Sequence, residues 1–262
     1  MNPLEFASKL AQETGDLLCR FYQPTGISAN LKPDLTVVTE ADIAADLYLR
    51  EAINNSYPED GILSEEADTT YSPQKSAVWI IDPLDGTTNF SLGLHYWGVS
   101  IARIVGNKPE TAALYFPLLN ELFTAQRGQG AFFNGHPLKI KPPDLSMPNT
   151  FFSCCSRAHK RYHIDIPYKT RILGSAAYDI CSVARGSSIL SFITTPKIWD
   201  LAAGWLVVKE AGGIIQSLEQ ENVFPLQPDL NYELKSYPLL VAATPQLATQ
   251  GINKIQIKAK KF

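Results

Sequence analysis

This sequence of 262 residues lacks a cysteine framework, an excess of charge of one sign and long apolar runs. Its four cysteines have neither a C-x-x-C spacing nor the density of a disulfide scaffold, which predicts reduced thiols. The formal net charge of -3 gives no sign of the broad basic surface that non-specific attraction to nucleic acid or membranes requires. We therefore expect neither nucleic acid nor a membrane as a partner.

The N-terminus also lacks the pattern of a targeting segment. Glu5, Glu13 and Asp16 interrupt its apolar residues, which does not happen in the apolar core of a signal peptide. Elsewhere in the sequence, no run reaches the ~18 apolar residues of a membrane-spanning helix. These absences predict a cytoplasmic protein.

The composition that remains is that of a globular chain, with 45% apolar and 19% charged residues. This length can bury a sizeable core as one large domain or as two packed halves. Asn2 with Glu5 predicts a capped helix that begins at Pro3, and Thr39 with Asp42 predicts a second one.

Strand patterns occupy the middle of the sequence. Residues 78–82 form a short apolar strand, and residues 97–140 alternate apolar segments with turn signals, as in an antiparallel meander. Residues 138–149, rich in proline and polar residues, are the best candidate boundary, and short apolar strands alternate with helical stretches after them. We predict an α/β protein with an α+β N-terminal half at residues 1–143 and an α/β C-terminal half at residues 144–262.

The most informative segment is WIIDPLDGTTNF, residues 79–90. A strand there delivers Asp82 and Asp85 into a tight turn, and two carboxylates three residues apart repel each other unless a cation lies between them. Hard oxygen ligands at a strand end suit Mg²⁺. Gly86 allows the backbone to approach a ligand closely, and Thr87 can open a helix whose free N–H groups accept a phosphate.

Taken singly, these acidic residues have simpler interpretations. An Asp-Pro-Gly turn is often only a solvated turn. Asp200 stands where a helix begins, as an N-cap residue would, and Glu65 and Glu66 in ILSEEAD fit ordinary surface charge. Their joint occurrence is what favours a common site.

Four segments together resemble the signatures of the inositol monophosphatase family: KPDLTVVTEAD at 32–42, SEEAD at 64–68, DPLDGTTNF at 82–90, and WDLAAG at 199–204 followed by EAGG at 210–213. The resemblance covers roughly residues 4–245, and Ser64 departs from it because the family usually has glycine there. It implies alternating layers of helices and sheets, an αβαβα sandwich with the active site between the halves. A homodimer and sensitivity to lithium are also implied.

The resemblance further implies which residues bind metal. Glu65, Asp82 and the backbone carbonyl of Leu84 would hold one Mg²⁺, and Asp82, Asp85 and Asp200 would hold a second. Two divalent ions neutralise four carboxylates, and paired metals about 3.5–4 Å apart can generate hydroxide and stabilise a leaving alkoxide. A weaker third metal site would lie near Asp42, through water.

The remaining implied roles concern water and substrate. Thr87 and Glu65 would bind the attacking water, which makes them catalytic together with Asp82, and the amides of Gly86 and Thr87 would bind phosphate. The resemblance also places Asp85 and Asp200 beside the substrate, and its alcohol side would be lined by Gly174, Ser175 and Ala176.

The substrate itself stays open in the sequence. Many inositol-preferring members carry glutamate at the position of Ile193, and losing that acceptor weakens the case for inositol 1-phosphate as sole substrate. Histidinol phosphate, fructose 1,6-bisphosphate and a nucleotide 3′-phosphate are alternatives, and so is a non-catalytic regulatory binding protein. Thiol catalysis by Cys154, Cys155 or Cys181 is disfavoured because no histidine stands in a motif that would activate a thiol.

Overall fold

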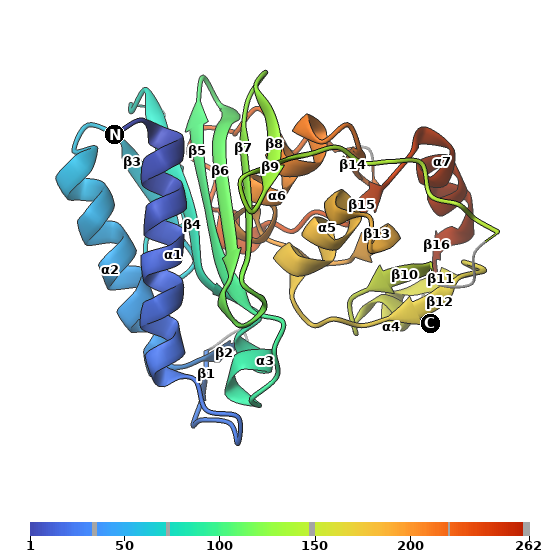
Figure 1. The fold of residues 1–262 in the computed structure, drawn as a ribbon, viewed down its shortest axis with the longest axis horizontal. Coiled ribbons are helices and arrows are strands. Elements are labelled where there is room, and N and C mark those ends of the chain that lie inside the picture. Colours follow the sequence, from blue (N-terminus) through green and yellow to red (C-terminus); the bar gives the residue numbers. More distant parts are fainter. Residues whose placement is uncertain (33–35, 72–73, 147–149, 220, 259–262) are drawn as a thin grey trace.

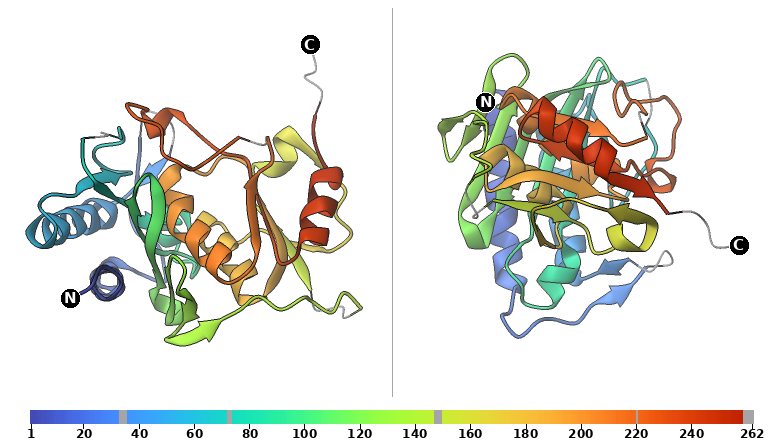
Figure 2. Two further views of the ribbon diagram at one scale, coloured as in Figure 1. Left: turned by 90° about the horizontal axis from the view of Figure 1, so that it is seen from above. Right: turned by 90° about the vertical axis from the view of Figure 1, so that its right-hand side faces the viewer.

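Helices and sheets alternate in five layers in this computed structural model (Figure 1). The structure describes residues 1–32, 36–71, 74–146, 150–219 and 221–258. Two helices cover the outer face of a seven-stranded sheet, two more lie between that sheet and a five-stranded one, and another covers the far side (Figure 2). The predicted α/β class with alternating layers is therefore confirmed.

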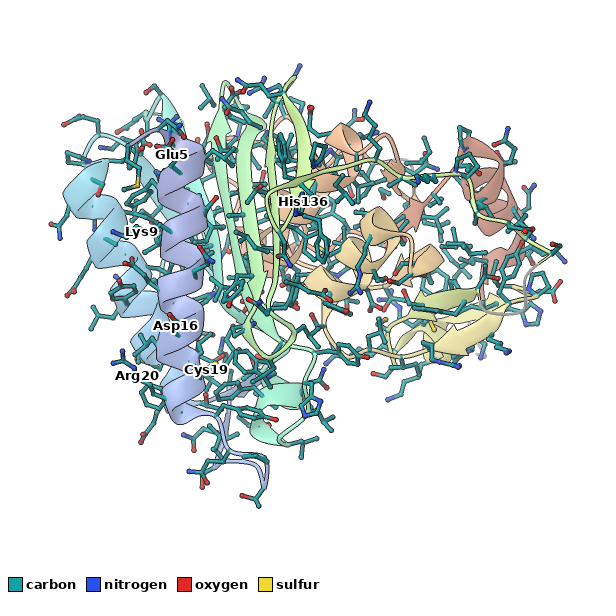
Figure 3. All side chains as sticks on the ribbon, in the orientation of Figure 1. Glu5, Lys9, Asp16, Cys19, Arg20 and His136 are labelled. Carbon is teal, nitrogen blue, oxygen red and sulfur yellow. The ribbon has the colours of Figure 1, made fainter. Side chains whose placement is uncertain are left out.

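The first layer consists of α1 (Pro3–Phe21) and α2 (Glu40–Ser56), and both begin where the sequence predicts. The Asn2 side chain accepts a hydrogen bond from the Glu5 N–H at 2.9 Å, and the Asp42 side chain accepts one from the Thr39 N–H at 2.7 Å. Both helices therefore have the expected capping boxes. The exposed Lys9 and Arg20 lie along the solvent side of α1 (Figure 3).

The seven-stranded sheet has the order β3 to β9; β5 to β9 are the predicted antiparallel meander, and β4 also pairs with β5 in antiparallel fashion. Its strands are β3 (Gly61–Ser64), β4 (Ala77–Asp85), β5 (Gly98–Val105), β6 (Lys108–Phe116), β7 (Glu121–Gln126), β8 (Gly130–Phe133) and β9 (His136–Leu138). All nine residues of β4 are buried because helices cover both faces of the sheet. β3 pairs in parallel with β4, so both strands end at the same edge.

The second sheet has the order β12-β10-β13-β15-β14. Its strands are β10 (Phe151–Cys154), β12 (Lys169–Arg171), β13 (Ser188–Ile193), β14 (Ile214–Ser217) and β15 (Leu239–Ala242). Between the sheets lie α5 (Ala176–Arg185) and α6 (Ile198–Glu210), and α7 (Pro245–Lys254) packs on the outer face. These elements match the strand and helix alternation expected after the boundary segment.

Short elements complete the chain. They are β1 (Asn30–Leu31), β2 (Val37–Val38), α3 (Thr87–Ser91), α4 (Ala158–Arg161), β11 (Tyr162–Ile164), β16 (Ile255–Ile257) and two 3₁₀ turns, Pro117–Leu119 and Tyr232–Leu234. None of the helices in the described ranges is long and apolar enough to cross a membrane.

One continuous buried cluster joins the two predicted halves. It includes Leu63 and Ile80 of the first sheet, Leu201 of α6 and Leu240 of the second sheet. The linker between β9 and β10 contains the proposed division at 143/144, and residues 147–149 of the boundary segment lie outside the described residues. Because the halves share a core, the division remains a prediction about sequence organisation.

Candidate metal and phosphate site

Three of the predicted metal ligands converge at the edge where β3 and β4 end. Glu65, Asp82 and Asp200 each offer a carboxylate oxygen, and the three oxygens lie within 4.8 Å of one another. They line a cavity of about 280 Å³. The same cavity is lined by further residues that the sequence singled out: Leu84, Asp85, Gly86, Thr87 and Gly174.

Local structure explains how residues distant in sequence meet here. Ser64 pairs with Ile81 in the parallel register of β3 and β4, so the residues that follow each, Glu65 and Asp82, emerge side by side. Asp200 comes from the first turn of α6, where its Oδ2 accepts a hydrogen bond from the Lys197 N–H at 2.8 Å. The N-cap of α6 is therefore Lys197, and the interpretation of Asp200 as the N-cap residue was wrong by three positions.

The three carboxyl groups strongly disfavour one another's charge. Burial, and then repulsion from Asp200, raises the pKa of Glu65 to about 8, and burial, followed by repulsion from Asp85, raises the pKa of Asp200 to about 7. Burial also raises the pKa of Asp82, which is 1% exposed, well above its ordinary value. A divalent cation would relieve this repulsion. Because all three side-chain donors are carboxylate oxygens, they fit Mg²⁺.

Lys32 partly compensates this charge and was not among the predicted site residues. Its Nζ lies 3.3 Å from Glu65 Oε1 and 2.5 Å from Glu66 Oε1. The signal was present in the sequence, because Lys32 opens the KPDLTVVTEAD segment. Residues 33–35 of that segment lie outside the described residues.

Asp85 lines the cavity but stands apart from the three-oxygen cluster. Its carboxylate accepts hydrogen bonds from the Ser175 hydroxyl, from the Ala176 N–H at 3.1 Å and from the Ala177 N–H at 3.3 Å. Burial raises the pKa of Asp85 to about 6, and the hydrogen bond from Ser175 opposes that rise. Two residues predicted for the substrate side, Ser175 and Ala176, thus anchor Asp85 to the start of α5, while Gly174 faces the cavity.

The turn after β4 is held in a conformation that requires glycine. Gly86 has a φ of +87°, and a Cβ there would lie 2.8 Å from the Tyr96 carbonyl oxygen. The Thr87 hydroxyl that follows lies 3.0 Å from both Asp42 Oδ1 and the Leu84 carbonyl oxygen. Asp42 therefore accepts a hydrogen bond from Thr87 with one carboxylate oxygen and caps its own helix with the other.

Asn89, which was also missed, ties this turn to the second half. Its Nδ2 donates to the Tyr96 carbonyl at 2.7 Å and to the Leu173 carbonyl at 2.8 Å. The departure from the family pattern at Ser64 has a definite role as well, because its hydroxyl donates to Asp46 Oδ1 at 2.5 Å. Neither contact can be read from sequence spacing.

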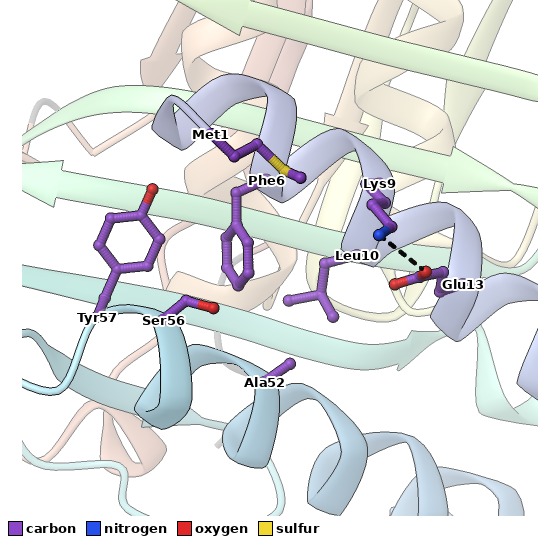
Figure 4. Close-up of a pocket in the computed structure, with 8 residues that line it drawn as sticks. All are labelled: Met1, Phe6, Lys9, Leu10, Glu13, Ala52, Ser56 and Tyr57. Atoms are coloured by element: carbon purple, nitrogen blue, oxygen red, sulfur yellow. Dashed lines mark ion pairs between the residues drawn. The ribbon is translucent and has the colours of Figure 1, made fainter.

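Two other features were tested as rival sites. Cys154 Sγ lies 4.0 Å from His159 Nε2, but burial raises the pKa of Cys154 to about 12, so the thiolate that catalysis needs does not form at neutral pH. A groove of about 380 Å³ between α1 and α2 is lined by residues that include Phe6 and Tyr57 (Figure 4). No predicted site residue is among the described residues that line it.

Comparisons with known proteins agree with the motifs. The family model described as the inositol monophosphatase family matches residues 2–257. Nus factor SuhB of Pasteurella multocida is 34% identical, with 98% of this chain and 97% of the relative covered. The IMPase of Thermotoga maritima superposes with a TM-score of 0.79 at 27% identity, covering 97% of each chain.

A further solved structure shares the fold at lower identity. An IMPase/NADP phosphatase complexed with Mg²⁺ and phosphate superposes with a TM-score of 0.79 at 21% identity, covering 95% of each chain. The expected likeness of fold is therefore confirmed independently of the signature motifs. The match of the family model over nearly the whole sequence, together with the full-length relative, establishes that this chain belongs to the inositol monophosphatase family.

Proposed function

We propose that this protein is a Mg²⁺-dependent phosphatase that hydrolyses a small phosphate monoester, inositol 1-phosphate or a related sugar or alcohol phosphate. The observation that carries the proposal is the convergence of Glu65, Asp82 and Asp200 in one cavity, with pKa values raised by burial. Membership of the family supports it, and so does the Mg²⁺-bound state of a structural neighbour.

The metal ligands in this proposal are Glu65, Asp82 and Asp200, with Asp85 and the Leu84 carbonyl beside them. When bound, Mg²⁺ supplies positive charge for the phosphate and lowers the pKa of water. The protein's own part is to keep these oxygens close together, which costs stability without the cation. Lys32 offsets part of that cost on the side of Glu65.

Thr87 and Gly86 orient the reacting groups. If the Thr87 hydroxyl donates its single hydrogen to Asp42, its oxygen lone pairs are left to accept a hydrogen bond from water. The positive φ of Gly86 turns the backbone sharply between β4 and α3, and Gly86 and Thr87 both line the cavity, so their amides are candidate backbone donors for a phosphate.

Phosphate release from a panel of esters tests this proposal. The panel is inositol 1-phosphate, histidinol phosphate, fructose 1,6-bisphosphate and adenosine 3′,5′-bisphosphate, each with Mg²⁺ and with a chelator. We expect turnover that depends on Mg²⁺ and favours one ester. Absence of turnover on all four, or turnover that the chelator does not affect, would contradict the proposal.

A regulatory role is the second candidate, and the specific observation that favours it is the name of the full-length relative, Nus factor SuhB. The two roles are compatible in one protein. Co-purification from cell extract with wild type and with Asp82→Asn separates them. A partner retained by the variant supports a regulatory surface independent of catalysis, and absence of any partner argues for an enzyme alone.

A further inference from the structure

A second cavity opens beside the catalytic one, on the side where the alcohol part of a substrate would lie. It measures about 200 Å³ and shares Arg157, Gly174 and Asp200 with the catalytic cavity. Arg157 precedes the short helix α4 and therefore stands at the junction of the two cavities. Among the described residues that line either cavity, it is the one with a cationic side chain.

The guanidinium N–H groups of Arg157 are available to bind a ligand. Its side chain is exposed, and within the described ranges its guanidinium forms no hydrogen bond or ion pair with another residue. An arginine fork presents five N–H donors in a plane that matches the geometry of phosphate and carboxylate. Charge-assisted pairs of this kind are the strongest hydrogen bonds available to a protein surface.

The second cavity is also lined by two carboxyl groups, Asp179 and Asp200, and Asp200 is one of the proposed metal ligands. Ile193, 3% exposed, supplies an apolar surface to this cavity. A glutamate at this position, as in many inositol-preferring members of the family, would instead accept hydrogen bonds from sugar hydroxyls. Asp179 also lines the cavity, but burial raises its pKa to about 8, so this carboxyl group is mostly uncharged at neutral pH. With Asp179 mostly protonated and Asp200 assigned to the metal, Arg157 supplies the charge that a substrate group would meet in this cavity, which favours an anion over a neutral polyol.

We propose that Arg157 binds a second anionic group, a phosphate or a carboxylate, on the alcohol part of the substrate. The preferred substrate is then a phosphate monoester that carries this second anion, in place of a neutral polyol monophosphate. This inference rests on the proposed phosphatase function and specifies its substrate class. Arg157 acts as a specificity-determining residue.

The test compares matched pairs of esters that differ only by the second phosphate. The pairs are fructose 1,6-bisphosphate with fructose 1-phosphate, and adenosine 3′,5′-bisphosphate with adenosine 3′-phosphate. The variants are Arg157→Gln and Arg157→Lys, and Lys160→Gln is the matched control because Lys160 is an exposed cation one turn away that lines neither cavity.

We expect Arg157→Gln to lower kcat/KM on the bisphosphates about 10- to 100-fold more than on the matched monophosphates, as loss of a charge-assisted pair predicts. Arg157→Lys should recover part of this loss, and Lys160→Gln should change neither ratio. The pair that loses most identifies the sugar or the nucleoside as the alcohol part. Equal losses on both members of each pair would overturn the proposal, because Arg157 would then act on the transferred phosphate.

A binding measurement keeps this inference separate from the proposed activity. Calorimetry with Ca²⁺ in place of Mg²⁺ compares adenosine 3′,5′-bisphosphate with adenosine 3′-phosphate on wild type and Arg157→Gln. Preference for the bisphosphate that the variant loses supports Arg157 even if no ester is hydrolysed. Equal affinities in the wild type refute the role of Arg157 whatever the turnover.

Discussion

Removal of Mg²⁺ should make the stability of this protein fall as pH rises. The metal-free native state keeps protons on Glu65, Asp82 and Asp200, whose pKa values are raised, while the unfolded chain loses them near pH 4. The stability that these groups contribute is therefore full below about pH 4. It is lost as pH rises through their native pKa values, which are about 7 for Asp200 and about 8 for Glu65.

The size of this loss in unfolding free energy depends on how many protons the metal-free native state retains. Each one costs about 1.4 kcal/mol of unfolding free energy per pH unit. Between pH 6 and 7, Glu65 and Asp200 alone hold one to two such protons, which gives a loss of at least about 1.4 to 3 kcal/mol. For a chain of this size that corresponds to a fall in Tm of roughly 3–10 °C per pH unit.

Mg²⁺ should reverse this dependence because it binds the deprotonated carboxylates. At 100 times its dissociation constant it adds about 2.7 kcal/mol, and that gain should be larger at pH 8 than at pH 6. Differential scanning calorimetry at pH 6, 7 and 8, with EDTA or with Mg²⁺, measures both effects. A metal-free Tm that stays constant or rises over this range would refute the reasoning, as would a Mg²⁺ gain that does not depend on pH.

Three further predictions concern catalysis, backbone strain and assembly. Asp82→Asn should abolish turnover and the gain in Tm from Mg²⁺ while the circular dichroism spectrum is unchanged; Asp229→Asn, at an exposed site, should match wild type in both assays. Gly86→Ala should cost about 1–3 kcal/mol in chemical denaturation because of its positive φ and the Tyr96 carbonyl, whereas Gly106→Ala, at a site with a positive φ but open space around it, should cost less. The homodimer stays a prediction, and light scattering should give twice the chain mass; a monomer at micromolar concentration would exclude it.

Features set by short-range chemistry could be predicted from the sequence. The capping boxes at Asn2 and Thr39 depend on residues three positions apart, and both helices begin where expected. The buried face of α2 could not be predicted in the same way. Ile43 and Leu47 are 55% and 50% exposed, because the small side chain of Ala45 lies on the side that packs closely against the sheet.

In the candidate site, too, the residues in local motifs could be predicted from the sequence, and the long-range contacts could not. The convergence of Glu65, Asp82 and Asp200 follows from motifs that occur together, although no single motif requires it. The anchoring of Asp85 by Ser175 depends on two residues 90 positions apart. Such partners are brought together by tertiary packing and leave no signal in local spacing.

The shared core beneath the site has a consequence for how substrates enter. The helix α6 packs against strands of the first sheet and also supplies Asp200. A hinge motion that separated the two halves would therefore expose the shared hydrophobic core. Domain closure is then not available as a means of sensing the substrate. Substrate selection then rests on the charge and shape of the residues that line the two cavities.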